Sequence, residues 1–147
     1  MNSEHLLSSL NERQREAVLA TEGPLLVLAG PGSGKTRVLT HRVAYLIAHG
    51  TPPENILAVT FTNKAADEMK SRIASLTADR EVRYRGRDPF IGTFHSFAVR
   101  ILRVHASAVG HMRTFTIFDA DDSLSLMKEA CKEIGINPKQ FPPGMLL

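Results

Sequence analysis

A glycine-rich octapeptide limits what this chain can fold into more than any other feature of the sequence. It comprises Ala29, Gly30, Pro31, Gly32, Ser33, Gly34, Lys35 and Thr36. The apolar run Leu25–Leu28 precedes it, and a segment with helical periodicity follows it. Glycines let a chain wrap tightly between a strand and a helix, so that backbone N–H groups and the helix N-terminus surround phosphate oxygens. The octapeptide therefore predicts a P-loop.

Two side chains of this loop carry the chemistry that phosphate binding requires. Lys35 is expected to neutralise charge on the β- and γ-phosphates of a nucleotide, and the Thr36 hydroxyl is expected to ligate Mg²⁺. A glycine usually stands at the first position of the pattern, where this chain has Ala29. The alternative is a glycine-rich turn that merely ends a strand. The Gly-Lys-Thr ending in this context favours phosphate binding.

Strand-like and helical segments alternate along the rest of the chain. Apolar runs predict strands at 25–28, 56–61 and 90–93, and a short extended piece at 115–118. Helices are predicted at about 11–20, where Asn11 is the expected N-cap, and at about 35–49, 63–76, 94–109 and 120–134. The run at 25–28 is continuous, as in a strand that is buried on both faces. Alternation of this kind builds a parallel sheet covered by helices, so the predicted fold class is α/β.

Two other segments resemble functional motifs, but the sequence favours a purely structural interpretation of each. Four arginines, Arg80, Arg83, Arg85 and Arg87, resemble a nucleic-acid patch, but interleaved acidic residues favour an exposed loop from 77 to 89. Phe115–Asp119 could be a Walker B strand that ends in an aspartate ligand of Mg²⁺. No glutamate follows Asp119 and a helical segment begins at once, which favours Asp119 as a helix N-cap.

Composition narrows the class of protein further. The 147 residues suffice for one globular core, and the net charge of +3 is compatible with a polyanionic partner without requiring one. The single cysteine, Cys131, excludes an internal disulfide framework, and no Cys/His spacing resembles a zinc site. The sequence shows no signal-peptide pattern and no run of membrane-spanning length. These observations predict a cytoplasmic protein with no membrane association.

Four segments together resemble the superfamily 1 DNA helicases of the UvrD/Rep/PcrA type. They are Leu10–Val18, similar to the family's Q motif; Ala29–Thr36, similar to its P-loop variant, which commonly begins with alanine; Thr60–Met69, similar to motif Ia; and Gly92–Phe97, similar to motif Ib. Their order and spacing match the family. The resemblance implies a RecA-like arrangement of the predicted sheet and helices, with ATP and Mg²⁺ as cofactors.

The resemblance also implies which residues bind the nucleotide. Gln14 would hydrogen-bond the adenine edge, because an amide can pair with both a ring nitrogen and the exocyclic amine, and this would favour ATP over GTP. Arg37 would lie close to the nucleotide. Without the motifs around them, both residues would be interpreted as ordinary exposed helix residues. The P-loop residues from Ala29 to Thr36 complete the nucleotide site, with Lys35 and Thr36 in the catalytic roles.

The implied DNA contacts lie where two predicted strands end. Open α/β sheets present the carboxyl ends of their strands to ligands. The implied DNA-binding residues are Phe61, Thr62, Asn63, Lys64, His95 and Ser96. An aromatic ring there can stack on a base, and the polar side chains can hydrogen-bond phosphates without reading sequence. The alternatives are that Phe61 closes the core and that His95 is a helix-capping or buried histidine.

The family implies a division of the chain at about residue 110. Residues 1–110 would begin a RecA-like ATP-binding domain, 1A, and residues 111–147 would begin a helical inserted subdomain, 1B. An apolar strand that ends in the Asp-Glu pair for magnesium, and the arginines of a second RecA-like domain, are not found in the sequence. The apolar end at Gly144–Leu147 also resembles the start of another helix. We therefore expect a fragment, separated from the remaining 1B, 2A and 2B domains.

The expected function is that of a piece of an ATP-dependent DNA helicase. By resemblance, the whole protein would move 3′ to 5′ along single-stranded DNA, act at duplex junctions, and serve repair or replication. The piece alone is expected neither to hydrolyse ATP nor to unwind DNA. Two other classes of function remain open from the residues: a small P-loop kinase or phosphotransferase, and a non-catalytic module that binds single-stranded DNA.

Overall fold

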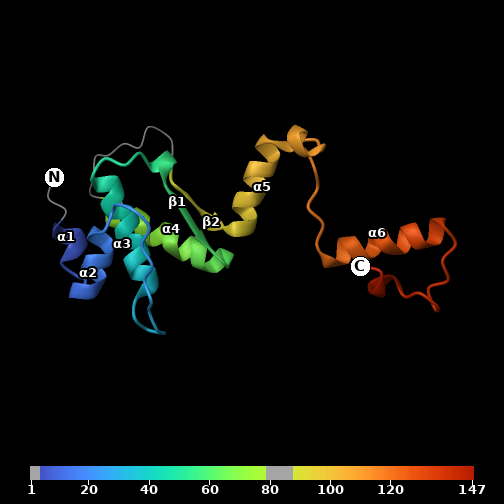
Figure 1. Cartoon of the computed structure of the whole chain (residues 1–147), viewed down its shortest axis with the longest axis horizontal. Coiled ribbons are helices and arrows are strands. Elements are labelled where there is room, and N and C mark those ends of the chain that lie inside the picture. Colours follow the sequence, from blue (N-terminus) through green and yellow to red (C-terminus); the bar gives the residue numbers. More distant parts are fainter. Residues whose placement is uncertain (1–3, 79–87) are drawn as a thin grey trace. The chain divides into compact units, whose positions relative to one another are not determined.

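The computed structural model describes residues 4–78 and 88–147, which form several helices and one small parallel sheet (Figure 1). The α-helices are α1 (Glu4–Leu7), α2 (Glu12–Leu19), α3 (Lys35–Ala48), α4 (Asn63–Thr77), α5 (Phe94–Val104) and α6 (Ala120–Glu133). The strands are β1 (Leu57–Thr60) and β2 (Phe90–Thr93). Short 3-10 helices lie at Pro53–Asn55, Ala106–Val109 and Pro143–Met145. The chain divides into two compact units, Met1–Ile101 and Leu102–Leu147.

The sheet consists of β1 and β2, which run parallel. Their register pairs Leu57 with Phe90 and Thr60 with Thr93, so the two strands end side by side. Parallel strands need a crossover connection, and α4 lies within it. The prediction of an α/β chain with a parallel sheet is confirmed in this coarse form, and the element boundaries at 63 and 90–93 lie where the sequence predicts them.

The main core lies between α3, α4 and one face of the sheet. Its buried residues are Val43, Ile47, Ile56, Met69 and Ile73, and Leu46, Ala58 and Ile91 pack against them. Ala58 and Ile91 are paired in the sheet register and therefore project from the same face. The two helices thus cover one face of β1 and β2, which fixes the ends of both strands relative to α3.

A second apolar cluster attaches the first two helices to α3. Leu7, Ala17, Val18 and Val38 form it. Two buried or half-buried side chains of α3 add polar anchors: His41 Nδ1 lies 2.7 Å from the Leu6 carbonyl oxygen, and Arg42 Nη1 donates to the Ala17 carbonyl at 2.6 Å. Because α2 is held on α3 in this way, its N-terminal turn lies beside the glycine-rich loop that precedes α3.

The run Leu25–Leu28 differs from its prediction as a buried strand. It adopts neither helix nor strand, and all four leucine and valine side chains are exposed, Leu26 at 82% and Leu28 at 87%. A strand needs ladder partners, and within the described residues β1 and β2 pair with each other in a two-stranded sheet. The apolar pattern is therefore present without the neighbours that would bury it, and the predicted strand is wrong for this chain.

The unit Leu102–Leu147 contains the end of α5 and all of α6. The predicted helix at 94–109 is corrected here: α5 ends at Val104, and Ala106–Val109 forms a separate 3-10 turn. The segment 115–118 is not a strand. Asp119 caps α6 as predicted, since its carboxylate accepts from the N–H groups of Asp121 at 2.9 Å and Asp122 at 2.8 Å.

Two further predictions from the sequence concern the arginine-rich segment and the absence of a membrane-spanning run. The arginines Arg80, Arg83, Arg85 and Arg87 lie outside the described residues, and so does most of the predicted loop from 77 to 89. Across the residues that the structure describes, no helix is both long and apolar enough to cross a membrane.

Candidate functional site

The glycine-rich loop leads into α3 through two residues in the left-handed region. Gly32 has φ +73° and Gly34, the N-cap of α3, has φ +85°. Among the described residues no side chain caps α3, whereas side chains cap α2, α4 and α6. The first N–H groups of a helix have no intrahelical acceptor. Of these four helices, α3 is thus the one whose first N–H groups have no side-chain acceptor.

Lys35 bends back over the loop that precedes it. Its ammonium donates to the carbonyl oxygens of Ala29 at 3.1 Å and Gly30 at 2.8 Å. The Gly30 carbonyl also accepts from the Ser33 hydroxyl at 2.7 Å. A single positive charge is therefore held in the curve of the loop by neutral carbonyl groups. An anion that enters this curve offers the ammonium a stronger, charge-assisted partner.

Gln14 contacts the loop from α2. Its side-chain oxygen accepts from the Asn11 backbone N–H at 3.2 Å, which completes the N-terminal capping box of α2. Its amide nitrogen donates to the Ser33 carbonyl at 2.9 Å. A Cβ at position 34 would lie 2.7 Å from that nitrogen, so the glycine is required for this approach as well as for its φ. The structure thus brings together two predicted site regions that are far apart in the sequence.

Thr36 and Arg37 occupy the first turn of α3, directly after the loop. Thr36 is half-buried, and Arg37 is exposed on the surface of the helix. Among the described residues no group of three or more His, Cys, Asp or Glu side chains gathers to hold a metal. Thr36, the predicted Mg²⁺ ligand, therefore lies in the first turn of α3, directly after the glycine-rich loop.

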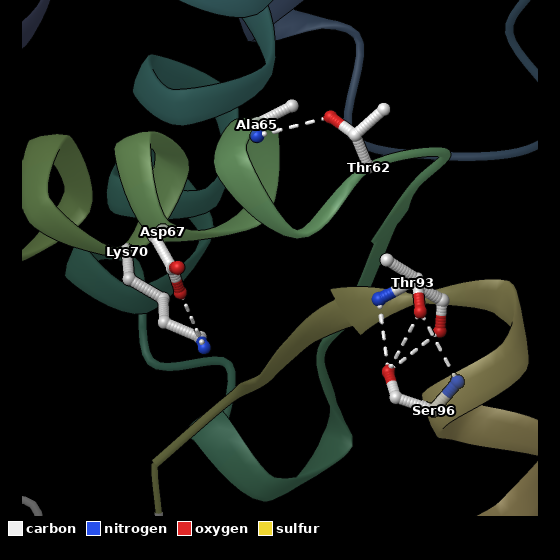
Figure 2. A network of polar contacts seen from close by, with 6 residues as sticks. All are labelled: Thr62, Ala65, Asp67, Lys70, Thr93 and Ser96. Carbon is white, nitrogen blue, oxygen red and sulfur yellow. Dashed lines mark hydrogen bonds and ion pairs between the residues drawn. The ribbon is translucent and has the colours of Figure 1, made fainter.

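The carboxyl ends of β1 and β2 form a second polar region (Figure 2). Thr62 caps α4, because its hydroxyl accepts from the Ala65 N–H at 3.2 Å. Thr93 and Ser96 cap α5 reciprocally: the Ser96 hydroxyl accepts from the Thr93 N–H at 2.9 Å, and the Thr93 hydroxyl accepts from the Ser96 N–H at 3.2 Å. Both helices therefore begin at the same edge of the sheet.

The predicted DNA-contact residues lie exposed along this edge. Phe61 is 87% exposed, and its ring centroid lies 5.5 Å from that of Phe94. The alternative that Phe61 closes the core is therefore wrong. His95 is also exposed, which excludes a buried histidine, and Asn63 and Lys64 occupy the exposed first turn of α4.

Phe94 is the residue of this edge that sequence reasoning missed. It follows the last residue of β2, just as Phe61 follows the last residue of β1. The signal was present as an aromatic residue at the end of one predicted strand, Phe61, and directly after the next, Phe94. Recognising it required the register of the two strands, which the sequence pattern does not supply.

Comparison with known proteins identifies the family. Residues 10–146 match the sequence model of the UvrD/REP helicase N-terminal domain. The chain belongs to the UvrD/REP helicase family. This match includes both the glycine-rich loop before α3 and the carboxyl edge of β1 and β2, so both candidate regions lie within the matched UvrD/REP domain.

Individual relatives of this UvrD/REP domain are helicases. The chain is 52% identical over 146 residues to the ATP-dependent DNA helicase PcrA of Bacillus subtilis strain 168. It is 51% identical over 143 residues to the PcrA of Staphylococcus aureus strain Mu50, and 49% identical to that of Staphylococcus epidermidis strain RP62A. These alignments cover 97–99% of this chain and 19% of each relative. The chain thus spans about a fifth of the length of these relatives.

Proposed function

We propose that this chain forms the nucleotide-binding part and one DNA-contacting edge of an ATP-dependent DNA helicase. The observation that carries the proposal is the side-chain-free start of α3, with the Lys35 ammonium held in the curve of the loop and Gln14 bonded to the same loop. The helicase activity of the PcrA relatives supports the same conclusion. Single-stranded DNA and its junctions with duplex are the proposed partners.

The proposed nucleotide site uses the residues from Ala29 to Arg37 together with Gln14. The loop N–H groups and the start of α3 bind phosphate oxygens, and Lys35 exchanges its carbonyl partners for the β- and γ-phosphates. Thr36 offers its hydroxyl to Mg²⁺, which supplies positive charge beside the phosphates when it is bound. Gln14 and Arg37 flank the nucleotide, with Gln14 on the adenine edge.

The proposed DNA contacts lie along the carboxyl edge of the sheet. Phe61 stacks on a base, which its exposure of 87% permits without rearrangement of the core. Asn63, Lys64 and His95 contact the phosphate backbone. Thr62 and Ser96 cap α4 and α5, and their hydroxyl groups also contact the DNA phosphates. None of these groups reads base edges, so binding is expected to tolerate any sequence.

The remaining parts of the proposal concern the whole protein. We infer that residues 1–110 begin a RecA-like 1A domain and residues 111–147 begin the inserted 1B subdomain, with 2A and 2B supplied elsewhere. The proposed activity is 3′ to 5′ translocation on single-stranded DNA in the cytoplasm, in repair or replication. Hydrolysis requires groups beyond the phosphate-binding loop, so the chain alone binds ATP without turning it over.

The nucleotide site is tested by isothermal titration of the chain with Mg·ATP and Mg·GTP. We expect weak ATP binding that Lys35→Ala abolishes, because the phosphate charge then has no cation in the curve of the loop. Lys70→Ala is the matched control, since it removes a lysine of α4 that pairs with Asp67 at 3.2 Å. Unchanged ATP binding in Lys35→Ala would refute the phosphate role of the loop.

Selectivity between the two nucleotides tests Gln14 separately. Gln14→Ala should lower ATP affinity by about 2- to 12-fold, the usual worth of a hydrogen bond of about 0.5–1.5 kcal/mol, and should change GTP affinity less. Arg13→Ala on the same helix is the control, because the Arg13 side chain is 91% exposed. Equal affinities of the parent chain for ATP and GTP would remove the adenine-reading role while leaving the phosphate role intact.

A further inference from the structure

Two aromatic rings meet at the carboxyl edge of the sheet, one from each strand. Phe61 directly follows β1 and Phe94 directly follows β2, whose last residues, Thr60 and Thr93, are paired in register. The ring centroids lie 5.5 Å apart and the ring planes are tilted by 48°. This separation falls within the range that aromatic pairs prefer, and such pairs contribute beyond the area that they bury.

The two rings differ in how firmly the structure holds them. Phe61 is 87% exposed, so the protein offers few contacts that could select one orientation of its ring. Phe94 is 51% exposed and occupies the first position of α5. The reciprocal bonds between Thr93 and Ser96 fix the backbone on either side of Phe94, at 2.9 Å and 3.2 Å (Figure 2). Phe94 is therefore the better anchored member of the pair.

We propose that Phe94 is a positioning residue, which holds the ring of Phe61 in the orientation that stacks on a base of single-stranded DNA. The inference rests on the proposed DNA contact of Phe61. A ring that is already oriented loses less rotational freedom when a base stacks on it, so preorganisation by Phe94 raises affinity without an additional contact to DNA. The capped start of α5 fixes the backbone at Phe94, and the Phe94 ring in turn restricts the ring of Phe61.

A second aromatic pair of the same unit provides a matched control. Phe90 and Phe97 have centroids 5.3 Å apart with planes at 57°, and the Arg100 guanidinium lies 5.5 Å from the Phe90 centroid. Phe90 is the first residue of β2, so this pair forms at the opposite end of the strand from Phe94. Phe97→Leu therefore removes the same kind of ring contact from α5 without touching Phe61.

The test is a titration of the chain with a single-stranded oligonucleotide that contains 2-aminopurine, a base whose fluorescence is quenched on stacking. Phe94→Leu should weaken binding by about 2- to 12-fold, the worth of an aromatic pair of about 0.5–1.5 kcal/mol, and should reduce the quench at saturation. Phe94→Tyr keeps an aromatic ring and should therefore keep the affinity and the quench of the parent. Phe97→Leu should also leave the affinity and the quench at the parental level. In a Phe61→Leu background, Phe94→Leu should weaken binding no further.

A second measurement detects the positioning role without DNA. Carbon relaxation of the Phe61 ring in the free chain should show a less ordered ring in Phe94→Leu than in the parent or in Phe97→Leu. A circular dichroism spectrum like that of the parent shows that the variant remains folded. An unchanged Phe61 ring order in folded Phe94→Leu would overturn the inference.

The outcomes separate this inference from the function on which it rests. If Phe61→Leu weakens binding and Phe94→Leu does not, the positioning role fails and the DNA contact of Phe61 stands. If Phe94→Leu weakens binding equally with and without Phe61, Phe94 contacts DNA by itself and the positioning role fails. If Phe61→Leu has no effect, the proposed contact fails and the inference fails with it, whereas ATP titration still reports on the nucleotide site.

Discussion

Gln14 and Gly34 show how one residue pair links two motifs. The Gln14 amide nitrogen donates to the Ser33 carbonyl at 2.9 Å, and this approach is possible because position 34 has no Cβ. A nucleotide base that takes the same donor competes with Ser33 for it. The proposed adenine recognition by Gln14 and the conformation of the glycine-rich loop are therefore coupled in this chain.

The contact at Gly34 predicts a stability difference between two glycine substitutions. Gly34 and Gly50 both have positive φ, +85° and +92°, so alanine at either position should destabilise by about 1–2 kcal/mol from the left-handed backbone alone. Gly34→Ala should cost about 0.5–1.5 kcal/mol more, because its methyl group displaces the Gln14 amide from Ser33. At Gly50 a Cβ meets nothing within 4 Å.

Chemical denaturation followed by circular dichroism measures both variants. The additional loss in Gly34→Ala should disappear in a Gln14→Ala background, where no amide is left to displace. Equal free energies of unfolding for Gly34→Ala and Gly50→Ala would contradict the packing role assigned to Gln14.

Helices and strands of this chain differ in how far the sequence predicts them. The N-caps Asn11 and Asp119 were predictable, because a cap side chain bonds to backbone only two or three residues ahead. The run Leu25–Leu28 has the pattern of a buried strand, but strand formation depends on partners that are distant in sequence, and the described chain supplies none for it. The pairing of Phe61 with Phe94 was missed for the same reason.

The capping role of Asp119 predicts a loss confined to α6. Asp119→Ala removes the acceptor for the Asp121 and Asp122 N–H groups and should destabilise the helix by about 0.5–2 kcal/mol. Asp119→Asn keeps an acceptor oxygen and should lose much less. Hydrogen exchange of the α6 amides is the measurement.

The same pair of variants distinguishes the cap from a magnesium ligand. Both substitutions remove the carboxylate charge, so both would weaken Mg²⁺-dependent ATP binding if Asp119 were the Walker B aspartate. We expect neither to change it. Loss of that binding in Asp119→Asn, with α6 still protected, would show that the residue serves the metal.

At the scale of the whole molecule, the chain contains the proposed phosphate-binding loop but covers 19% of the length of its PcrA relative from Bacillus subtilis. Hydrolysis requires a water oriented by a base and arginines that meet the growing charge on the γ-phosphate. One arginine finger alone is typically worth about 10³- to 10⁵-fold in rate. The described residues place Lys35 and Thr36 at the loop, and no cluster of acidic and histidine side chains joins them.

We therefore predict that the 147-residue chain shows no useful ATP turnover. A phosphate-release assay with saturating single-stranded DNA is the measurement, and Lys35→Ala controls for contaminating enzyme. DNA-stimulated turnover of about one per second would match the usual rates of complete phosphoryl-transfer enzymes. Such turnover, if it is absent in Lys35→Ala, would contradict the prediction.

The exposed run Leu25–Leu28 also predicts how the chain should behave in concentrated solution. The backbone N–H and C=O groups of these four apolar residues are not part of a β-ladder, so they can pair with a strand of a neighbouring molecule. The exposed side chains can pack against that molecule as well. An exposed apolar segment that carries no charge promotes aggregation. Aggregation of the purified chain should accordingly begin at this tetrapeptide, and Leu26→Lys should raise its solubility limit without reducing its helix content.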